Sequence, residues 1–250
     1  MDGVSWVLAS NPADQAAGGF DITGPLANRM VHMPWTFDAQ AWCDGMVNGF
    51  QMPSVPRLPE NWQNSLPECR ALVASFIHTF PQKAFVLPKS EAEWSGPWPS
   101  PRSWDMASQL LAACKAAGVN GDVQTELICG CVGTGMGIEF LTWCRDLDMP
   151  DPEALIKDPA SFKLPARTDK AYAVLNSVAA AIVANLTLPR WKAGLQIMAA
   201  AAKQGAPDVA AAACKQPAIN RPPNASAPQE AMVFLPLFQK AGMFPSGGAR

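Results

Sequence analysis

Helical periodicity runs through the chain from about residue 38 onward, and this feature constrains the fold more than any other. In the segment 101–117, apolar residues recur on one face of a helix, and Gly118 follows where that helix would end. Before residue 38, the apolar runs 4–9 and 30–35 have the length and composition of strands. Two strands are too few for a stable parallel sheet. The sequence therefore predicts a mainly helical chain that begins with two strands lacking a common partner.

The clearest helix start in the sequence carries an arginine. Ser100 is a suitable N-cap, and Pro101 occupies the first helical position, where its missing N–H costs nothing. Arg102 then falls in the first turn, where the partial positive charge of the free N–H groups disfavours a cation. An anion such as phosphate would be attracted by both the arginine and the N–H groups. The alternative is a solvated arginine, or one paired with Asp105.

The two predicted strands each end at a polar residue or at a proline. The run 4–9 leads to Asn11 before a proline, and the carboxyl end of a buried strand is where open α/β sheets place ligand-binding groups. An ordinary Asx turn explains Asn11 equally well. The run 30–35 is interrupted by Pro34 and contains His32, for which no carboxylate or cysteine partner is evident. We interpret His32 as a packed or rim histidine and His78, off the apolar stripe of its helix, as an exposed one.

Two further patterns predict local structure. A glycine cluster over 130–137 resembles a phosphate loop in composition, but no strand precedes it and no lysine follows it at the required spacing. We interpret this cluster as a close turn between two helices. Ser65 and Glu68 have the spacing of a capping box, ahead of a helix that continues to about residue 80.

Composition excludes several classes of protein. The formal net charge of −2 over 250 residues provides no basic field for nucleic acid. No apolar run is long enough to cross a bilayer, and no signal peptide is recognisable at the start. Seven cysteines without a secretory signal indicate free thiols, and the pair Cys129 and Cys131 has poor spacing for zinc. We therefore expect a cytoplasmic protein with no metal site.

Four stretches of the sequence share one family resemblance. The stretches ASNPADQAAGGFDITGPLANRMVHMPW (9–35) and PSPRSWDM (99–106) resemble the second half of an AAA+ ATPase of the MoxR-like, or dynein-related, type. The stretches GCVGTGMGIEFLTW (130–143) and LDMPDPEALI (147–156) are similar to the helical region of bacterial and phage members of that group. The resemblance covers most of residues 4–200 and is weakest after about residue 216. It implies a helical lid bundle preceded by a two-strand remnant of a truncated αβα core.

The resemblance assigns roles to three residues. Asn11 corresponds to the sensor-1 group, which holds the attacking water beside the γ-phosphate. Arg29, at the end of PLANR, corresponds to the arginine finger that reaches the nucleotide of a neighbouring subunit. Arg102, in PSPR, corresponds to the sensor-2 arginine, which contacts the phosphates from the lid. These residue types suit phosphoryl transfer, which depends on positioning and on charge stabilisation, and guanidinium binds phosphate oxygens bidentately.

The chain also departs from the family. It contains no G-x-x-x-x-G-K-S/T phosphate loop and no apolar strand ending in Asp-Asp or Asp-Glu. In the family both motifs precede the sensor-1 strand, with which this sequence begins. ATP and Mg²⁺ are therefore expected as ligands only together with the missing half of the core. We expect no cofactor for the isolated chain and no ATP hydrolysis by it.

The resemblance implies three regions: residues 1–50 as the core remnant, 51–215 as the helical lid, and 216–250 as a linker with a C-terminal amphipathic helix. Full-length relatives form rings, typically hexamers, and remodel partner proteins that often carry a von Willebrand factor A-like domain. Our first hypothesis is the sensor and lid half of such an ATPase. The alternative is a stand-alone, non-catalytic helical interaction module derived from the lid. A third hypothesis, an unrelated helical enzyme using His32 or His78, has the least support.

Overall fold

The computed structural model describes residues 7–9, 22–52, 57–223, 225–226 and 228–236. Within these residues the chain is mainly helical and contains no strand. Two short helices come first, α1 (Gly24–Ala27) and α2 (Ala39–Asn48). They are followed by the 3₁₀ turn η1 (Trp62–Ser65), α3 (Leu66–Thr79), η2 (Pro81–Lys83) and α4 (Glu91–Trp94). The predicted mainly helical class is thus confirmed.

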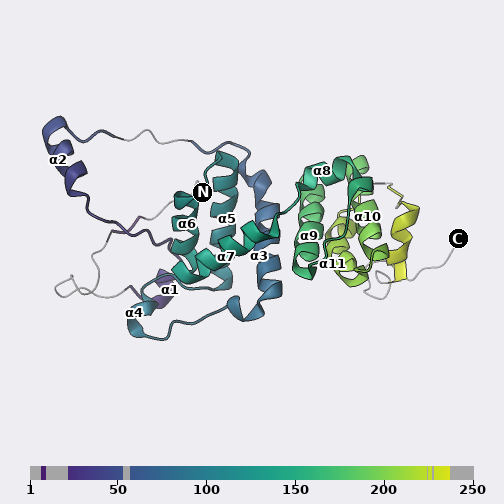
Figure 1. The fold of residues 1–250 in the computed structure, drawn as a ribbon, viewed down its shortest axis with the longest axis horizontal. Helices are drawn as coiled ribbons and strands as arrows, with labels where there is room; N and C mark the ends of the chain where they lie inside the picture. Colours follow the sequence, from purple (N-terminus) through teal and green to yellow (C-terminus); the bar gives the residue numbers. More distant parts are fainter. Residues whose placement is uncertain (1–6, 10–21, 53–56, 224, 227, 237–250) are drawn as a thin grey trace.

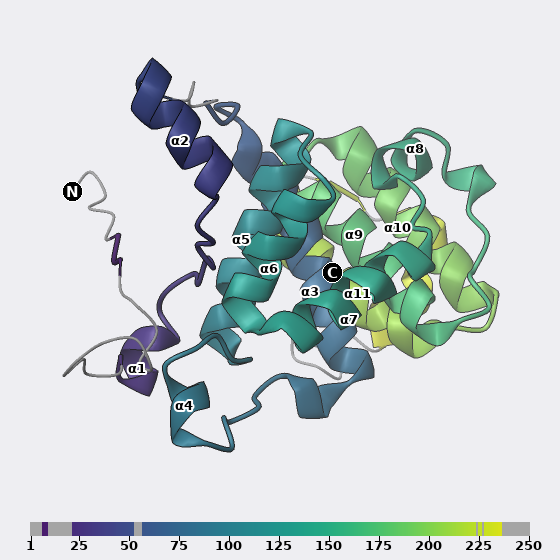
Figure 2. The ribbon, with the colours of Figure 1, turned by 60° about the vertical axis from the view of Figure 1, so that its left-hand side comes forward.

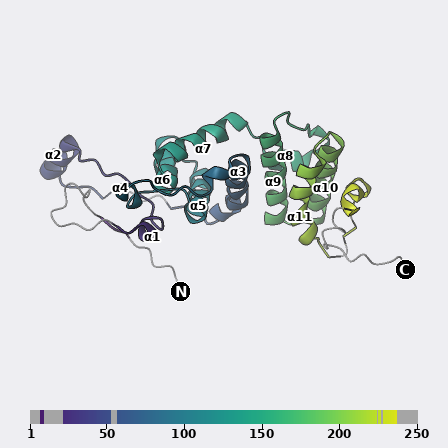
Figure 3. The same ribbon diagram turned by 90° about the horizontal axis from the view of Figure 1, so that it is seen from below.

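Three longer helices complete the first lobe, which Figure 1 shows on the left: α5 (Pro101–Ala117), α6 (Asp122–Val132) and α7 (Thr134–Leu147). The second lobe contains α8 (Pro152–Lys157), η3 (Pro159–Ser161), α9 (Thr168–Ala184), α10 (Leu188–Lys203), α11 (Pro207–Ile219) and η4 (Gln229–Phe234). Viewed from below, the two lobes lie side by side along the long axis (Figure 3).

Each lobe has its own hydrophobic core. In the first lobe, Phe76 of α3 is fully buried, and its ring contacts those of Trp104, Phe140 and Trp143 at centroid distances of 5.2–5.5 Å. In the second lobe, alanine-rich faces of α9, α10 and α11 pack around fully buried aliphatic side chains such as Ile182. Helix α9 connects the lobes, because its Ala173 belongs to the first core while its other buried residues belong mainly to the second.

The predicted helix–helix turn over the glycine cluster is confirmed. Helices α6 and α7 meet at Gly133, whose φ of +87° is rarely adopted by residues with a side chain. Gly130 permits a second close approach, since a Cβ there would lie 2.3 Å from the carbonyl oxygen of His32. The cluster therefore serves packing rather than phosphate binding.

The predicted strand over 30–35 is not formed. A strand requires a neighbouring strand for its hydrogen bonds, and the described residues offer none. In this segment the N–H of His32 instead donates to the carbonyl of Gly130, at the C-terminal end of α6, over 2.9 Å. Of the predicted strand 4–9, only residues 7–9 are described, and they form no strand. The two-strand remnant is therefore absent from the described part of the chain.

The predicted capping box at Ser65 is also absent. Ser65 precedes α3, but its side chain accepts no hydrogen bond from the helix. Glu68 turns away from the helix start and pairs with Lys115 of α5 at 2.5 Å. The long-range ion pair with Lys115 has replaced the local contact that the sequence spacing predicted.

Candidate functional site

The first turn of α5 is fixed by reciprocal capping between two serines. The Ser100 hydroxyl accepts a hydrogen bond from the N–H of Ser103 at 3.1 Å, and the Ser103 hydroxyl accepts one from the N–H of Ser100 at 2.8 Å. Both serines are buried. Pro101 occupies the first helical position, as the sequence predicted. The backbone that carries Arg102 is therefore held on both sides.

Arg102 itself is exposed, and within the described residues its guanidinium has no ion pair or hydrogen bond to another side chain. The carboxylate of Asp105 pairs with Arg70 of α3 instead, at 2.9 Å, and also accepts a hydrogen bond from Gln109. Pairing between Arg102 and Asp105, one of the alternatives drawn from the sequence, is therefore not observed. The first turn of α5 presents an uncompensated cation to solvent.

Arg29 follows Asn28, the C-cap of α1, and is also exposed. Its guanidinium donates to the carbonyl of Pro25, at the start of the same short helix. This local contact is to a neutral group and does not compensate the charge of Arg29. No acidic partner is found for it in the described residues. Asn11 lies outside the described residues, and its placement relative to the two arginines stays a prediction.

A buried asparagine joins the two arginine-bearing segments. Asn28 is 3% exposed, and its Oδ1 accepts a hydrogen bond from the Ser100 hydroxyl at 2.5 Å. Its Nδ2 donates to the carbonyl of Trp98 at 2.9 Å. The Ser103 hydroxyl donates to the same carbonyl, also at 2.9 Å. The end of α1 is therefore tied to the cap of α5 by a closed, buried network.

This network brings the neighbours of Arg29 and Arg102 into contact across about seventy residues of sequence. Close packing of α1 against the last residue of α4 supports the junction, since a Cβ at Gly24 would lie 2.4 Å from the Trp94 ring. In Figure 1, α1 and α4 lie together at one end of the first lobe. Sequence analysis did not single out Asn28. The only available signal was an asparagine at the end of a short helix, directly before the arginine.

Neither histidine lies in a catalytic arrangement. His32 is half-buried, and its Nε2 atom is 2.9 Å from the carbonyl oxygen of Ala27, which agrees with the predicted packed or rim role. His78 is exposed, as predicted, and its ring stacks on Tyr172 of α9 at a centroid distance of 4.2 Å. That stacking links α3 and α9. The hypothesis of a helical enzyme using His32 or His78 gains no support from these contacts.

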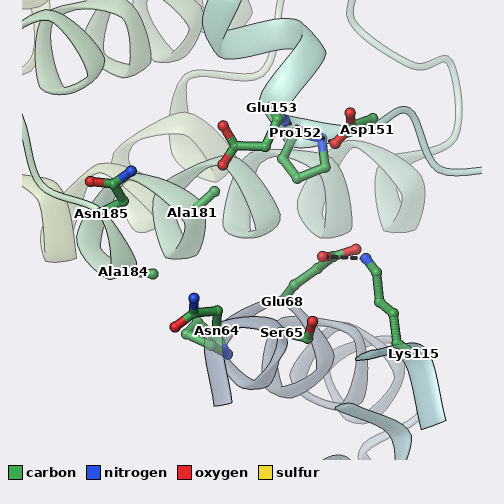
Figure 4. Close-up of a pocket in the computed structure, with 11 residues that line it drawn as sticks. Asn64, Ser65, Glu68, Lys115, Asp151, Pro152, Glu153, Ala181, Ala184 and Asn185 are labelled. Carbon is green, nitrogen blue, oxygen red and sulfur yellow. Dashed lines mark hydrogen bonds and ion pairs between the residues drawn. The ribbon is translucent and has the colours of Figure 1, made fainter. Parts of the chain in front are cut away.

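A polar cleft of about 420 Å³ separates the two lobes near the start of α3 (Figure 4). Its carboxylates are already engaged in contacts within the protein. Glu68 pairs with Lys115, and Asp151 caps α8 by accepting from the N–H of Glu153 at 3.0 Å. The carboxylate of Glu153 is held bidentately by Arg190, at 2.5 and 2.7 Å. The cleft therefore has the character of an interlobe contact, without a free acid or base.

Most of the cysteines behave as structural thiols. All seven are free, and burial raises the pKa of four of them to about 12, namely Cys69, Cys131, Cys144 and Cys214. Thiols with such pKa values are poor nucleophiles and poor metal ligands at neutral pH. Among the described residues, no group of three or more histidine, cysteine or acidic side chains is placed to hold a metal ion.

Comparison with protein-family models, with curated proteins and with solved structures finds no match for this chain. The described helices also include none that is long and apolar enough to cross a membrane.

Proposed function

We propose that the chain is the sensor and lid half of a MoxR-like AAA+ ATPase, which acts in the cytoplasm and couples ATP hydrolysis to the remodelling of partner proteins. The single observation that carries the proposal is the buried hydrogen bond between Ser100 and Asn28. It holds together the two segments whose arginines the resemblance assigns to phosphate contacts. Free thiols throughout the chain agree with a reducing compartment.

The chemistry of both arginines suits nucleotide phosphate. Arg102 is exposed and unpaired among the described residues, at a helix N-terminus whose free N–H groups also favour an anion. Arg29 is exposed and lacks an acidic partner among those residues. In this proposal Arg102 would contact nucleotide within its own subunit and Arg29 that of a neighbour in a ring, typically a hexamer. Asn11 would orient the attacking water. Bound MgATP would supply the phosphoryl group.

A comparison of the chain alone with an upstream-extended protein tests this proposal. The full chain alone is expected to hydrolyse no ATP and to show no thermal shift with micromolar ATP, because it has no phosphate loop. When the DNA upstream of Met1 encodes, in frame, a strand–loop–helix with G-x-x-x-x-G-K-S/T, the extended protein is expected to hydrolyse ATP. Arg29→Ala should then reduce the rate by about 10³-fold or more, and Arg102→Ala should weaken nucleotide binding.

Arg145 provides the matched control, since it is another exposed arginine of the first lobe, in the last turn of α7. Arg145→Ala should retain the activity of the extended protein. A clear thermal shift of the chain alone with micromolar ATP would contradict the need for an external phosphate loop. Full ATPase activity of the extended protein with Arg102→Ala would show that Arg102 does not contact the nucleotide phosphates as proposed.

The alternative proposal, a stand-alone interaction module, is favoured by one separate observation. Helix α2 has no buried residue and stands apart from both cores (Figure 2). Its apolar side chains, including Trp42 and Met46, are exposed to solvent. An in-frame stop codon directly upstream, together with stable expression of the chain, would favour this module over the ATPase half. Binding of a von Willebrand factor A-like domain would agree with either proposal.

A further inference from the structure

The segment before α2 and the helix itself form an exposed apolar arm, which we define as residues 31–52. Its large apolar side chains are mostly solvent-exposed, with Trp35 at 94%, Phe37 at 70% and Phe50 at 66%. The aromatic side chains of the arm alone expose on the order of 500 Å². That approaches the ~800 Å² which each partner contributes to a stable protein interface. The arm thus carries enough apolar surface for a specific contact.

Between residues 32 and 37, most free N–H groups of the described backbone lie on one edge, and only that of Thr36 lies on the other. In an extended segment, successive N–H groups point to opposite edges, and Pro34 favours an extended backbone at the residue before it. On the edge of the even-numbered residues, His32 already donates to Gly130, and Pro34 has no N–H. On the other edge, the N–H groups of Met33, Trp35 and Phe37 have no backbone partner in the described part of the chain.

We propose that this free edge pairs with the same edge of a second copy of the chain. The two segments would run antiparallel about a two-fold axis at Pro34, so that Met33 of each copy lies opposite Trp35 of the other. Every exposed N–H of the odd-numbered residues then finds a carbonyl, and the two prolines lie on the outer edges, where proline is tolerated. In such an interface both copies contribute the same surface, as in isologous dimers.

Several features of the arm favour a second copy as the occupant. The pairing places the thioether of Met33 opposite the indole ring of Trp35, and sulfur–aromatic contacts of this kind are favourable. Residues 33–37 carry no charge, so like charges do not oppose each other. The nearby Asp38 is engaged as the N-cap of α2 by accepting from the N–H of Ala41, and Asp44 accepts from Gln40. Each α2 can then cover the paired segments with its apolar side chains.

The proposal is independent of the ATPase activity, and sedimentation velocity of the full chain between about 1 and 50 µM tests it. We expect a concentration-dependent dimer. Trp35→Pro, which removes an N–H of the free edge, should raise the dimer dissociation constant about tenfold or more relative to Trp35→Ala, which removes the same ring but keeps the N–H. Thr36→Pro is the matched control, because it removes an N–H from the opposite edge. It should dimerise like the wild type.

Amide hydrogen exchange gives a readout of the pairing itself. Met33, Trp35 and Phe37 should exchange slowly at 50 µM and quickly at 1 µM, while Thr36 should exchange quickly at both concentrations. Far-UV circular dichroism checks that the variants keep their helices, which is expected because these residues lie outside both cores. A monomer at 50 µM overturns the proposal. So does a dimer that Trp35→Pro leaves intact, or one in which the three amides remain unprotected.

Discussion

The hydroxyl of Ser100 donates a 2.5 Å hydrogen bond to Oδ1 of Asn28, although the two residues are 72 positions apart in the sequence. Because Ser100 also caps α5, one hydroxyl connects the helix start to the end of α1. Arg102 lies two residues after Ser100 in the sequence, and Arg29 directly follows Asn28. Movement of either arginine-bearing segment is therefore resisted by the other, which gives the proposed phosphate-contacting groups a common support.

Asn28→Ala is expected to destabilise the chain by about 1–3 kcal/mol, because it removes one buried and one partly buried hydrogen bond and leaves the Ser100 hydroxyl without its acceptor. Urea denaturation followed by circular dichroism measures the free energy of unfolding. Asn64→Ala is the control, since Asn64 is exposed and should change that free energy by less than about 0.5 kcal/mol. Equal effects of the two substitutions would show that the network contributes nothing specific.

Phe76→Ala is expected to cost about 3–5 kcal/mol, since it leaves a cavity at the centre of the first aromatic core. The loss should be visible as a lower urea midpoint. Phe50→Ala, in the exposed arm, serves as the comparison and should leave the midpoint nearly unchanged. A small effect at Phe76 would mean that the ring cluster rearranges to fill the space.

Some parts of this structure were predictable because their signals are local. Ser100, Pro101 and Gly118 set both ends of α5 from neighbouring residues alone, and Gly118 has the left-handed φ of +66° that ends a helix. The prediction of a strand over 30–35 was wrong, because the β-propensity of a segment does not ensure that a neighbouring strand is present to accept its hydrogen bonds. The capping box at Ser65 failed for a related reason, because Glu68 found a long-range partner in Lys115.

In the candidate site, too, the local features were predictable and the long-range contact was not. The cap of α5 and the position of Arg102 in its first turn followed from residues 100–102. The link through Asn28 did not, because nothing in residues 24–29 indicates that they pack against a loop seventy residues later. The contact depends on tertiary packing, which periodicity and capping rules do not describe.

The ion pair between Glu153 and Arg190 should make stability depend on pH. The hydrogen bond from Arg190 lowers the pKa of Glu153 below its ordinary value of 4.5. A carboxyl with a lowered folded-state pKa stabilises the fold above the unfolded value, and this contribution disappears as the pH falls through the folded value. Since Glu153 is 45% exposed, the contribution is only about 0.5–1 kcal/mol.

Glu153→Gln is therefore expected to lower the free energy of unfolding at pH 7 and to lose this effect well below pH 4.5, as measured by urea denaturation at both pH values. Glu126→Gln is the control, because Glu126 is exposed and has no ion pair among the described residues. A difference between Glu153→Gln and the wild type that stays constant at acid pH would show that shape, not charge, holds α8 against α10.

Cysteine labelling should identify one fast thiol. Cys43 is exposed on α2, whereas the buried Cys69, Cys131 and Cys214 and the half-buried Cys144 have pKa values of about 12. At pH 8 such a thiol is only about 10⁻⁴ ionised, and the thiolate is the reactive form. Reaction with a disulfide reagent should therefore show one rapid phase that Cys43→Ser abolishes, with the remaining thiols reacting only in denaturant. Persistence of that phase in Cys43→Ser would assign it to the partly buried Cys129.

Arg102 and Arg145 should have opposite effects on stability, although both are exposed arginines at helix ends. Arg102 lies in the first turn of α5, where the helix dipole disfavours a cation, whereas Arg145 lies in the last turn of α7, where it is favoured. Arg102→Ala should therefore raise the free energy of unfolding by about 0.3–1 kcal/mol, and Arg145→Ala should lower it by a similar amount. Low-salt urea titrations resolve differences of this size. Residues that bind a ligand often lower the stability of the free protein. If Arg102→Ala instead lowered the free energy of unfolding, that result would count against a phosphate-contacting role for Arg102.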